Sequence, residues 1–522
     1  QRQQAIDPKR SFIIQAPAGS GKTELLIQRY LRLLTKVATP SKIVAVTFTK
    51  KACGEMRKRL QEALTSVNST QTLPPHKQLT QKLASDVYQH AKNTHWCIEN
   101  IPSECTILTI DAVIGKWLAL ASPHYSMWGQ FEVLLEPKNF YRTCVKTFIN
   151  TYGLADDAPL ADHFRKLLRY NHCDQSHLVE LLTLALSTRE QWLMHVFTHG
   201  DNEDLEHYLH ETISLLINNT VEQTLSICEE EIVKLVHALH DLYALIPTAL
   251  HPMIEHHSVY QLPLHLEWDV SQWQTLTAFL FTTQLTLRKK LQTKHGFLSK
   301  QHQKSLHENT RTDYLAACDD VYAILGTLTT KPTAIALLQE IHTLPIIKND
   351  EWETLQPLLA ILPKLAAYLH MTMVEQRVCD YPAKSIHIQQ ALHDPNSKLA
   401  ETLYQQVEHL LIDEFQDTSQ SQLAIFSQVV SHWEGEQHRT LAIVGDPMQS
   451  IYAFRQADVR LFEKVKTQGI AKHQLQALRL AHNYRSNSAL VNWNNALFSE
   501  LTKDKSPYFL PATATKDDPS GK

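Results

Sequence analysis

The chain has 522 residues, 43% of them hydrophobic, and a formal net charge of −4, which predicts a large protein of roughly three or four domains with substantial apolar cores. This charge does not indicate a basic nucleic-acid binder, although net charge averages over faces and a channel can be locally basic. The sequence has no signal peptide, no uninterrupted apolar run of about 18 residues and no CxxC pair among its eight cysteines, which disfavours export and membrane spanning and favours a cytoplasmic protein with reduced thiols.

The first predicted element is a strand, Ser11 to Gln15, and it is followed by the loop APAGSGKT and a helix. The helix carries Leu26, Tyr30 and Leu33 on one face. Strand, glycine-containing loop and helix in this order form the context of a phosphate-binding P-loop.

The loop residues supply what a triphosphate requires. Gly19 and Gly21 let backbone N–H groups approach phosphate oxygens, Lys22 reaches the outer phosphates, and Thr23 can ligate magnesium. We therefore expect ATP and Mg²⁺ as cofactors, held by Ala16, Pro17, Ala18, Gly19, Ser20, Gly21, Lys22 and Thr23. Ala16 stands where the general pattern has glycine, which costs little outside a left-handed conformation.

A second predicted strand and helix follow. The strand Ile43 to Val46 delivers Thr47, Phe48 and Thr49 to its tip. The helix after it buries an apolar stripe at helical spacing and leaves a basic face outside. The stripe is Met56, Leu60 and Leu64, and the basic face is Lys50, Lys51, Arg57, Lys58 and Arg59.

The long stretch from residue 121 to residue 399 predicts an all-helical subdomain, since it has few glycines and Ile232, Val236, Leu239 and Leu242 recur at helical spacing. Its basic run is open to two interpretations, contact with duplex DNA or a solvated loop; the run is Arg288, Lys289, Lys290, Lys294, Lys300 and Lys304. Its histidine pairs are expected to be surface or core residues and not zinc or iron–sulfur ligands, because no third ligand is in register. These pairs are His207 with His210 and His237 with His240.

A third strand, Leu410 to Ile412, ends in two acids, Asp413 and Glu414. A carboxylate at a strand end beside a P-loop is placed to hold magnesium, and the next carboxylate can orient or deprotonate the attacking water. We assign Asp413 to the metal and Glu414 to the water. The fold must then bring two strand ends together across the inserted stretch.

The strings DEFQDT, LAIVGDPMQSIYAFRQADVRLF and NYRS occur in that order, and with them the chain resembles the UvrD/RecB branch of superfamily-one helicases, most closely the RecB- or AddA-like subunit of ATP-dependent exonucleases. The resemblance covers about residues 1 to 120 and 400 to 495. It implies a RecA-like P-loop lobe with a parallel sheet, a large all-helical inserted subdomain and the start of a second RecA-like lobe. The implied segments are 1–120 and 400–470 for the first lobe, 121–399 for the insertion and 471–522 for the second lobe.

The resemblance also implies roles for individual residues. Gln449 would sense the γ-phosphate, since an amide can donate to phosphate and accept from water. Tyr484 would stack on adenine. Arg485 would contact the γ-phosphate from the second lobe with a guanidinium that is always charged. The residues implied in DNA binding are Thr47, Phe48, Lys50, Thr109, Asp111, Tyr452, Phe454 and Arg455. Aromatic rings among them would stack on unpaired bases.

The chain departs from the family pattern at a few positions. Val113 stands where the family usually has an aromatic residue, and Arg2 occupies the place of the adenine-reading glutamine. The later motor motifs and a nuclease-like D…ExK arrangement do not occur before Lys522, so we expect a piece of a longer protein that binds nucleotide weakly and shows little DNA-stimulated hydrolysis.

The function that the resemblance implies is that of an ATP-dependent 3′–5′ DNA helicase subunit of an exonuclease in double-strand-break repair. Its partners would be single-stranded DNA, junctions of single- and double-stranded DNA and a second nuclease or helicase subunit, with no membrane. Two alternatives stay open: a stand-alone repair helicase without nuclease, and a non-hydrolysing scaffold that binds DNA or a partner.

Overall fold

The computed structural model describes residues 1–68, 75–153, 160–199, 202–266, 268–344, 349–433, 438–453, 456–501 and 509–516. The chain forms two compact units. The first comprises Gln1–Ala161, Cys173–His195 and Leu362–Lys522, and the second Asp162–His172 and Val196–Ile361.

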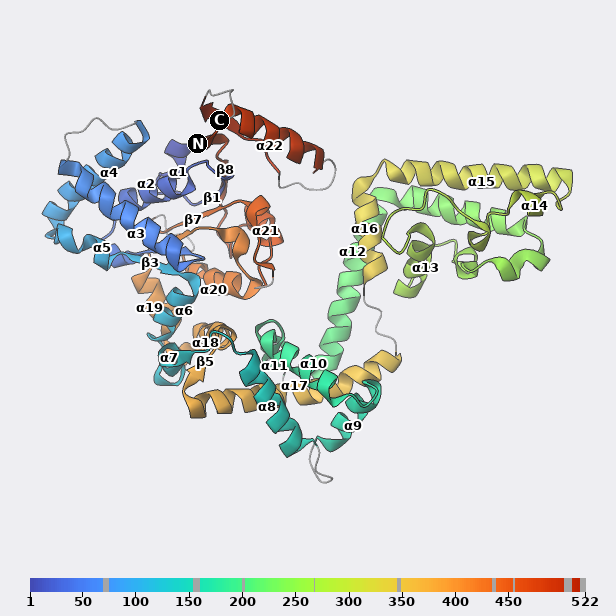
Figure 1. Ribbon diagram of the computed structural model, residues 1–522, viewed down its shortest axis with the longest axis horizontal. Coiled ribbons are helices and arrows are strands. Elements are labelled where there is room, and N and C mark those ends of the chain that lie inside the picture. Colours follow the sequence, from blue (N-terminus) through green and yellow to red (C-terminus); the bar gives the residue numbers. More distant parts are fainter. Residues whose placement is uncertain are drawn as a thin grey trace. The chain divides into compact units, whose positions relative to one another are not determined.

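The first unit is built around a six-stranded parallel sheet in the order β3-β2-β6-β7-β1-β8 (Figure 1). Its strands are β1 (Phe12–Gln15), β2 (Ile43–Thr47), β3 (Thr106–Thr109), β6 (His409–Ile412), β7 (Thr440–Gly445) and β8 (Gln476–Arg479). The strands are short and mostly apolar, as expected for a parallel sheet that is covered on both faces.

The register brings the carboxyl ends of the central strands to one level. Ile412 of β6 is opposite Ile443 of β7, and Gly445 of β7 is opposite Gln15 of β1. Since β7 lies between β6 and β1, the P-loop and the carboxylates after β6 face the same edge with the end of β7 between them. Ligands of open α/β sheets bind at this edge.

One face of the sheet is covered by helices that contribute to a single apolar core with the strands. Leu26, Tyr30, Leu60 and Ile107 all belong to it and are almost fully buried. The helices on this side are α2 (Lys22–Leu34), α3 (Lys50–Thr65) and α4 (Pro75–Thr94), with the short α1 (Arg2–Ala5) and α5 (Ile101–Glu104) beside them (Figure 1). The predicted apolar stripes of α2 and α3 are therefore confirmed.

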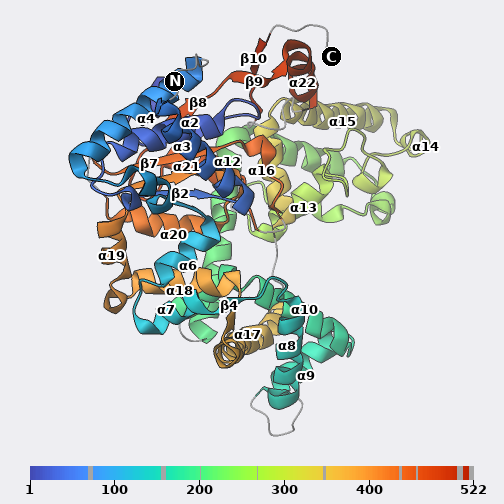
Figure 2. The same ribbon diagram turned by 60° about the vertical axis from the view of Figure 1, so that its left-hand side comes forward.

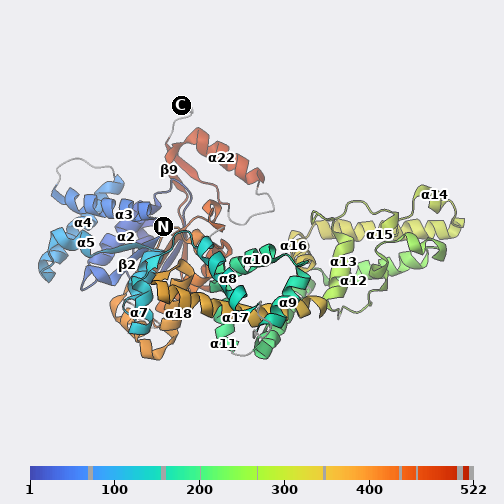
Figure 3. The ribbon, with the colours of Figure 1, turned by 60° about the horizontal axis from the view of Figure 1, so that its bottom comes forward.

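The remainder of the first unit is mostly helical. The helices are α6 (Ile110–Leu118), α7 (Pro123–Gln130), α8 (Lys138–Tyr152), α10 (Gln175–Ser187), α18 (Tyr381–His393), α19 (Leu399–Gln406), α20 (Gln420–Ser431), α21 (Arg460–Gln468) and α22 (Ser488–Leu501). Two small sheets pair β4 (Glu132–Val133) with β5 (Val378–Cys379) and β9 (His482–Asn487) with β10 (Thr513–Lys516). Helices α8 and α10 pack side by side (Figure 3).

A buried ion pair joins α8 and α18 to Arg189, the first residue of α11 (Arg189–His199). Arg189 donates to the Asp380 carboxylate at 2.5 Å, and Tyr141 of α8 donates to the same carboxylate. Asp380 also caps α18 by accepting from the Ala383 N–H. Arg189 is 4% exposed and Asp380 1%, so each charge depends on the other for compensation.

The second unit is helical in its described part, apart from one isolated bridge (Figure 2). Its long helix α12 (Asn202–Ala244), which has a kink at Cys228, packs against α15 (Glu308–Thr329) and α16 (Pro332–Thr343). The same unit contains α13 (Val270–Leu280), α14 (Lys300–Gln303) and most of α9 (Ala161–Tyr170). The periodic residues Ile232, Val236, Leu239 and Leu242 are fully buried in its core, as predicted. Helices α11 (Arg189–His199) and α17 (Asn349–Gln376) contribute residues to both units.

By length and composition, one described helical segment, Leu355–Gln376, could cross a membrane, as could the bent pair Glu308–Thr329 with Pro332–Thr343. Leu365, Leu369 and Met373 of the first segment are buried within the protein. Core helices of other proteins meet the same criterion.

The predicted α/β class is confirmed by the mixed architecture and its parallel sheet. The division into segments 1–120, 121–399, 400–470 and 471–522 stays a prediction. Strand β8, which completes the first sheet, begins at Gln476, past the proposed boundary at residue 470. All eight cysteines are free thiols.

Candidate nucleotide site and the adjoining aromatic pair

The P-loop follows β1 directly and has the backbone geometry of a phosphate cradle. Gly19 and Gly21 have φ angles of 76° and 77°, a left-handed conformation that glycine adopts without strain. Ala16 is not among the residues with positive φ, so its methyl group is tolerated in place of glycine. Lys22 and Thr23 begin α2, where the helix N-terminus favours bound anions.

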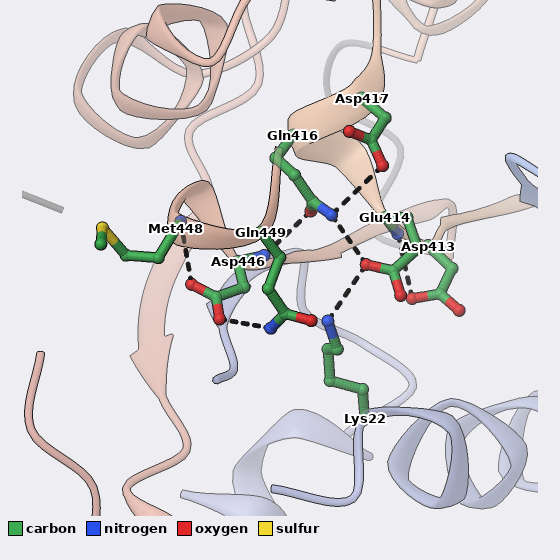
Figure 4. Close-up of polar contacts among 8 residues, drawn as sticks. All are labelled: Lys22, Asp413, Glu414, Gln416, Asp417, Asp446, Met448 and Gln449. Atoms are coloured by element: carbon green, nitrogen blue, oxygen red, sulfur yellow. Dashed lines mark hydrogen bonds and ion pairs between the residues drawn. The ribbon is translucent and has the colours of Figure 1, made fainter. Parts of the chain in front are cut away.

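The two predicted halves of the site meet. The Lys22 Nζ atom lies 3.0 Å from Oε2 of Glu414, which makes an ion pair between the P-loop and the end of β6. Asp413 is held in place because its backbone N–H donates to the Val46 carbonyl and its carboxylate accepts from the Glu414 N–H. Figure 4 shows Lys22, Glu414 and Asp413 together at one edge of the sheet.

Burial changes the acid strength of the carboxylates. Desolvation, followed by the charge of Glu414, raises the pKa of Asp413 to about 7, against the lowering effect of Lys22. The same two causes raise the pKa of Asp417 to about 6. Crowding carboxylates in a buried place is unfavourable without a compensating cation, and such a cluster is typical of a site that binds one.

Glu414 has a strained backbone. Its φ angle is 52°, in the left-handed region that residues with a side chain seldom adopt. Strain of this kind persists where the surrounding structure enforces it and clusters at functional sites. Its carboxylate is held by Lys22 and by Gln416, whose Nε2 donates at 2.8 Å.

Gln416 links the segment after β6 to the segment after β7. Its amide donates to Glu414 and, at 3.4 Å, to Asp417, and its Oε1 accepts from the Asp446 N–H at 2.9 Å (Figure 4). Gln416 is 1% exposed, so these are buried contacts. A Cβ at Gly445 would lie 2.7 Å from the Gln416 Oε1 atom, which explains why the end of β7 has no side chain there.

The segment after β7 places Gln449 beside the same group. Asp446 accepts from the Met448 N–H and from the Gln449 amide, so the Gln449 side chain is oriented by Asp446 (Figure 4). Its carbonyl oxygen lies toward Lys22 in this view.

Strand β9 contacts the P-loop from the other end of the chain. The Tyr484 N–H donates to the Gly19 carbonyl at 2.9 Å, and the Asn483 amide donates to the Ala18 carbonyl at 3.1 Å. Arg485 is exposed, with its Cβ about 3.0 Å from where a Gly19 Cβ would be. Tyr484 and Arg485 therefore lie beside the phosphate loop, and their roles toward adenine and the γ-phosphate stay predictions.

Among the predicted DNA-contact residues that the structure describes, Phe48 and Lys50 follow β2, Thr109 ends β3, and Tyr452 comes after β7. The Phe48 and Tyr452 rings pack together with centroids 4.2 Å apart, although the residues are far apart in sequence. Lys50 is exposed, but Thr47 is fully buried, so its hydroxyl does not reach the surface in this conformation. Phe454 and Arg455 lie outside the described residues.

The next predicted motif begins α6. Thr109 caps this helix by accepting from the Ala112 N–H, and Asp111 is half-buried in its first turn. Val113 is fully buried, so the position that departs from the family pattern belongs to the core.

The other open features lie in the second unit. Lys294 of the basic run forms an ion pair with Glu255, and Lys289, Lys290 and Lys300 are exposed. The His240 ring is bonded to the Leu262 carbonyl, and the side chains of His207 and His210 lie outside the described residues. Within the described part of the chain no three histidine, cysteine or acidic side chains are grouped to hold a metal ion.

The residues at the sheet edge fit a magnesium nucleotide. The positive φ angles of the loop, the lysine and the helix start suit phosphate, and the buried carboxylates suit a divalent cation, which prefers hard oxygen ligands. Among the described residues the buried Ser20 hydroxyl has no hydrogen-bond partner, so a polar atom in the cradle is left for a ligand. Thr23 and Asp413 would hold Mg²⁺, and Lys22 the outer phosphates.

The sequence alone assigns no role to Gln416, Asp446 or Asn483, which the structure places inside the site. A role for Gln416 could have been predicted, because it stands between Asp413 and Asp417 and a buried amide at that place needs hydrogen-bond partners. Asn483 gave no such indication, since its contact with the Ala18 carbonyl joins distant parts of the chain.

This parallel sheet, with a P-loop after one strand and acids after a neighbouring strand, defines a P-loop nucleotide-binding protein. The chain belongs to the UvrD/REP helicase family, whose N-terminal domain profile matches residues 1–469. The resemblance to this branch is thus confirmed.

Relatives in bacteria carry names that combine helicase and nuclease. The chain is similar to an "ATP-dependent helicase/nuclease" subunit of Latilactobacillus sakei, with 24% identity over 96% of this chain and 54% of that protein. It is similar to "Exonuclease/helicase subunit RexA" of Lactococcus lactis, with 22% identity over 95% of this chain and 39% of that protein. A shorter match, 34% identical over 26% of this chain and 12% of the relative, is to "RecBCD enzyme subunit RecB" of Haemophilus influenzae. The chain spans about half or less of the length of the relatives that match throughout it.

Proposed function

We propose that this chain is the first motor part of an ATP-driven DNA helicase that moves 3′ to 5′ along single strands, as a subunit of an exonuclease that acts in double-strand-break repair. The observation that carries the proposal is the ion pair between Lys22 and Glu414, 3.0 Å long, which unites the P-loop with the acids after β6.

In this proposal the side chains divide the chemistry. Lys22 binds the outer phosphates, and because Glu414 pairs with Lys22, bound phosphate competes with Glu414 for the amine. Released from Lys22, the Glu414 carboxylate can orient the attacking water and take its proton. Gln449 and Arg485 would contact the γ-phosphate. Magnesium bound by Thr23 and Asp413 would neutralise charge on the phosphates.

The DNA contact follows from the aromatic pair. Phe48 follows β2, the neighbour of β6, and Tyr452 lies three positions after Gln449 in the chain. Rings that stack on unpaired bases bind any sequence, as a translocating motor requires. We expect single-stranded DNA and its junctions with duplex DNA to bind beside Phe48 and Tyr452, with Lys50, Thr109 and Asp111 near the DNA backbone.

The partner proposal rests on the names of the relatives, which describe subunits of helicase and nuclease assemblies. We propose a second subunit for this protein. Purification from its native cells at endogenous abundance should yield it with a second polypeptide; recovery as a lone chain would favour a stand-alone helicase.

The nucleotide chemistry is tested by comparing the wild-type chain with Lys22→Ala and Glu414→Gln. We expect Glu414→Gln to bind ATP and to lose hydrolysis at single turnover, and Lys22→Ala to lose binding by at least about tenfold, since a lysine–phosphate contact is charge-assisted. Calorimetry measures binding, and release of phosphate with and without single-stranded DNA measures hydrolysis. Binding and hydrolysis at the wild-type level in both variants would contradict the proposal.

A further inference from the structure

Two carbonyl oxygens of the phosphate loop are held by the strand β9. The Asn483 amide donates to the Ala18 carbonyl at 3.1 Å, and the Tyr484 N–H donates to the Gly19 carbonyl at 2.9 Å. The Asn483 side chain is itself fixed, because its Oδ1 atom accepts from two N–H groups further along its own strand, each at 2.9 Å. The contact between Asn483 and Ala18 joins residues that are 465 positions apart in the chain.

Arg2 of α1 holds the next two carbonyls of the loop. Its Nη2 atom donates to the Ser20 carbonyl at 2.5 Å and to the Gly21 carbonyl at 3.1 Å. The helix that carries Arg2 is anchored, since the buried guanidinium of Arg29 donates to the Ala5 carbonyl at 2.7 Å. Four successive carbonyls of the loop are therefore held by donors from outside it.

The two glycines of the loop let these residues approach. A Cβ on Gly19 would lie 2.6 Å from the Asn483 Oδ1 atom, and a Cβ on Gly21 would lie 2.5 Å from the Arg2 Nη2 atom. A side chain at either position would push its neighbour away from the loop. Glycine therefore serves the contacts with Asn483 and Arg2 as well as the left-handed backbone.

Holding the carbonyls also sets the direction of the loop N–H groups. In a trans peptide the C=O of one residue and the N–H of the next residue point in opposite directions. The peptides that Asn483 and Arg2 hold carry the N–H groups of Gly19, Gly21 and Lys22. These N–H groups therefore point away from the two donors, and an array of N–H groups before a helix is what binds phosphate oxygens.

Resting on the function proposed above, we infer that Arg2 and Asn483 are positioning residues of the phosphate loop: they brace its carbonyls, so that its N–H groups are arranged for phosphate before a ligand binds. We call this pair the carbonyl brace. Without it the loop adopts other conformations, and the apparent Kd rises as the binding-competent conformation becomes less populated. The brace acts on the binding of the phosphates and not on that of the base.

The experiment compares ATP with inorganic tripolyphosphate, which has the phosphates without a base or a ribose. Calorimetry in the presence of magnesium gives the Kd of both ligands for the full chain, with any purification tag at the carboxyl end. The brace variants are Arg2→Ala and Asn483→Ser, a neutral change whose hydroxyl keeps the local turn and is too short to reach the loop. The matched controls are Arg10→Ala, which changes an exposed arginine of the same segment, and Asn487→Ser, which changes an asparagine of the same strand that bonds to the first turn of α22.

Both brace variants should weaken the binding of tripolyphosphate and of ATP by the same factor, about threefold to about twentyfold, as the loss of one or two hydrogen bonds predicts. Arg2→Lys should recover part of the loss, because an ammonium group still donates. A second measurement needs no ligand: the loop N–H groups should exchange hydrogen faster in both variants, since the loop opens more often. The controls should behave as the wild type, and circular dichroism establishes that each variant is folded.

Failure of the brace is distinguishable from failure of the proposed function. If Arg2→Ala and Asn483→Ser bind tripolyphosphate as the wild type does, or if their loop N–H groups exchange at the wild-type rate, the inference is wrong. A loss confined to ATP would also overturn it, because these residues would then contact another part of the nucleotide. If the wild type binds no ATP, or Lys22→Ala binds ATP as the wild type does, the proposed function itself is wrong.

Discussion

A buried histidine at the start of β6, the end of the strand away from the nucleotide site, should make the sheet acid-sensitive. His409 begins β6 and is 2% exposed, and its Nδ1 is bonded to the Thr440 hydroxyl at 2.9 Å. Burial, and then the positive charges of Arg29, His438 and Arg439, hold its pKa at about 3, below the ordinary value of 6.5. Arg29 also donates to the Thr440 hydroxyl at 3.1 Å, so a charged imidazole would lie beside a fixed guanidinium.

The direction of the effect follows from proton binding. Above pH 6.5 neither the folded nor the unfolded His409 binds a proton, so the pH does not change the stability through this residue. Below that value the unfolded chain binds a proton that the folded chain refuses, so stability falls as the pH decreases toward about 3. The slope is about 1.4 kcal/mol per pH unit, which amounts to about 2 kcal/mol at pH 5.

The perturbation is His409→Asn, which keeps a polar atom near the Thr440 hydroxyl and does not titrate. Unfolding by urea is followed at pH 7.5 and at pH 5.0 through the hydrogen exchange of the peptide that contains β6. The free energy of unfolding obtained in this way refers to the sheet that contains His409. Between the two pH values the wild type should lose about 2 kcal/mol more than His409→Asn. The matched control, His432→Asn, changes an exposed histidine and should lose as much as the wild type. An equal loss in His409→Asn and the wild type would refute a role for this imidazole.

Three further perturbations test contacts elsewhere in the first unit. Arg189→Ala leaves the buried Asp380 carboxylate unpaired and should lower the free energy of unfolding by about 3 to 5 kcal/mol, measured by urea denaturation; a loss below about 1 kcal/mol would contradict a buried pair. Gly445→Ala places a Cβ 2.7 Å from the Gln416 Oε1 atom and should lower the free energy of unfolding by about 1 to 3 kcal/mol and weaken ATP binding. An unchanged free energy of unfolding and an unchanged ATP affinity in calorimetry would show that Gln416 moves freely. Phe48→Ala should weaken binding of a single-stranded oligonucleotide by about 1 to 3 kcal/mol in fluorescence anisotropy while ATP affinity stays as in the wild type; unchanged oligonucleotide affinity would exclude base stacking on this ring.

The parts of the fold that the sequence predicts are those set by local pattern. The strand before the P-loop and the strand before Asp413 follow from short apolar runs that are buried at every position. The stripes of α2 and α3 follow from apolar residues that recur with the helical period of 3.6. The meeting of Lys22 with Glu414 was also predictable, because ligand-binding groups gather at the carboxyl ends of parallel strands.

The spacing of residues in the sequence does not show which distant strands and side chains contact one another. Nothing in the sequence of β8 indicates that it joins β1, since its residues are only partly apolar and the helix α21 separates it from β7. The contact of Arg2 with Tyr484 joins the two ends of the chain, and each residue alone is typical of an exposed side chain. Such contacts depend on the whole fold being formed first.

The nucleotide site and the aromatic pair are expected to communicate through Gln416. This residue holds Glu414 on one side and the Asp446 N–H on the other, and its own backbone carbonyl accepts from the Ser450 hydroxyl at 3.2 Å. The short segment from Asp446 to Tyr452 is therefore attached to Gln416 at two points before it reaches the ring that packs on Phe48. If bound phosphate draws Lys22 away from Glu414, the Glu414 carboxylate that accepts from the Gln416 amide is no longer fixed. A movement of Gln416 would then pass through only a few residues before it reached the rings of Tyr452 and Phe48. A motor needs such a path, because hydrolysis that did not move the DNA-holding surface would do no work.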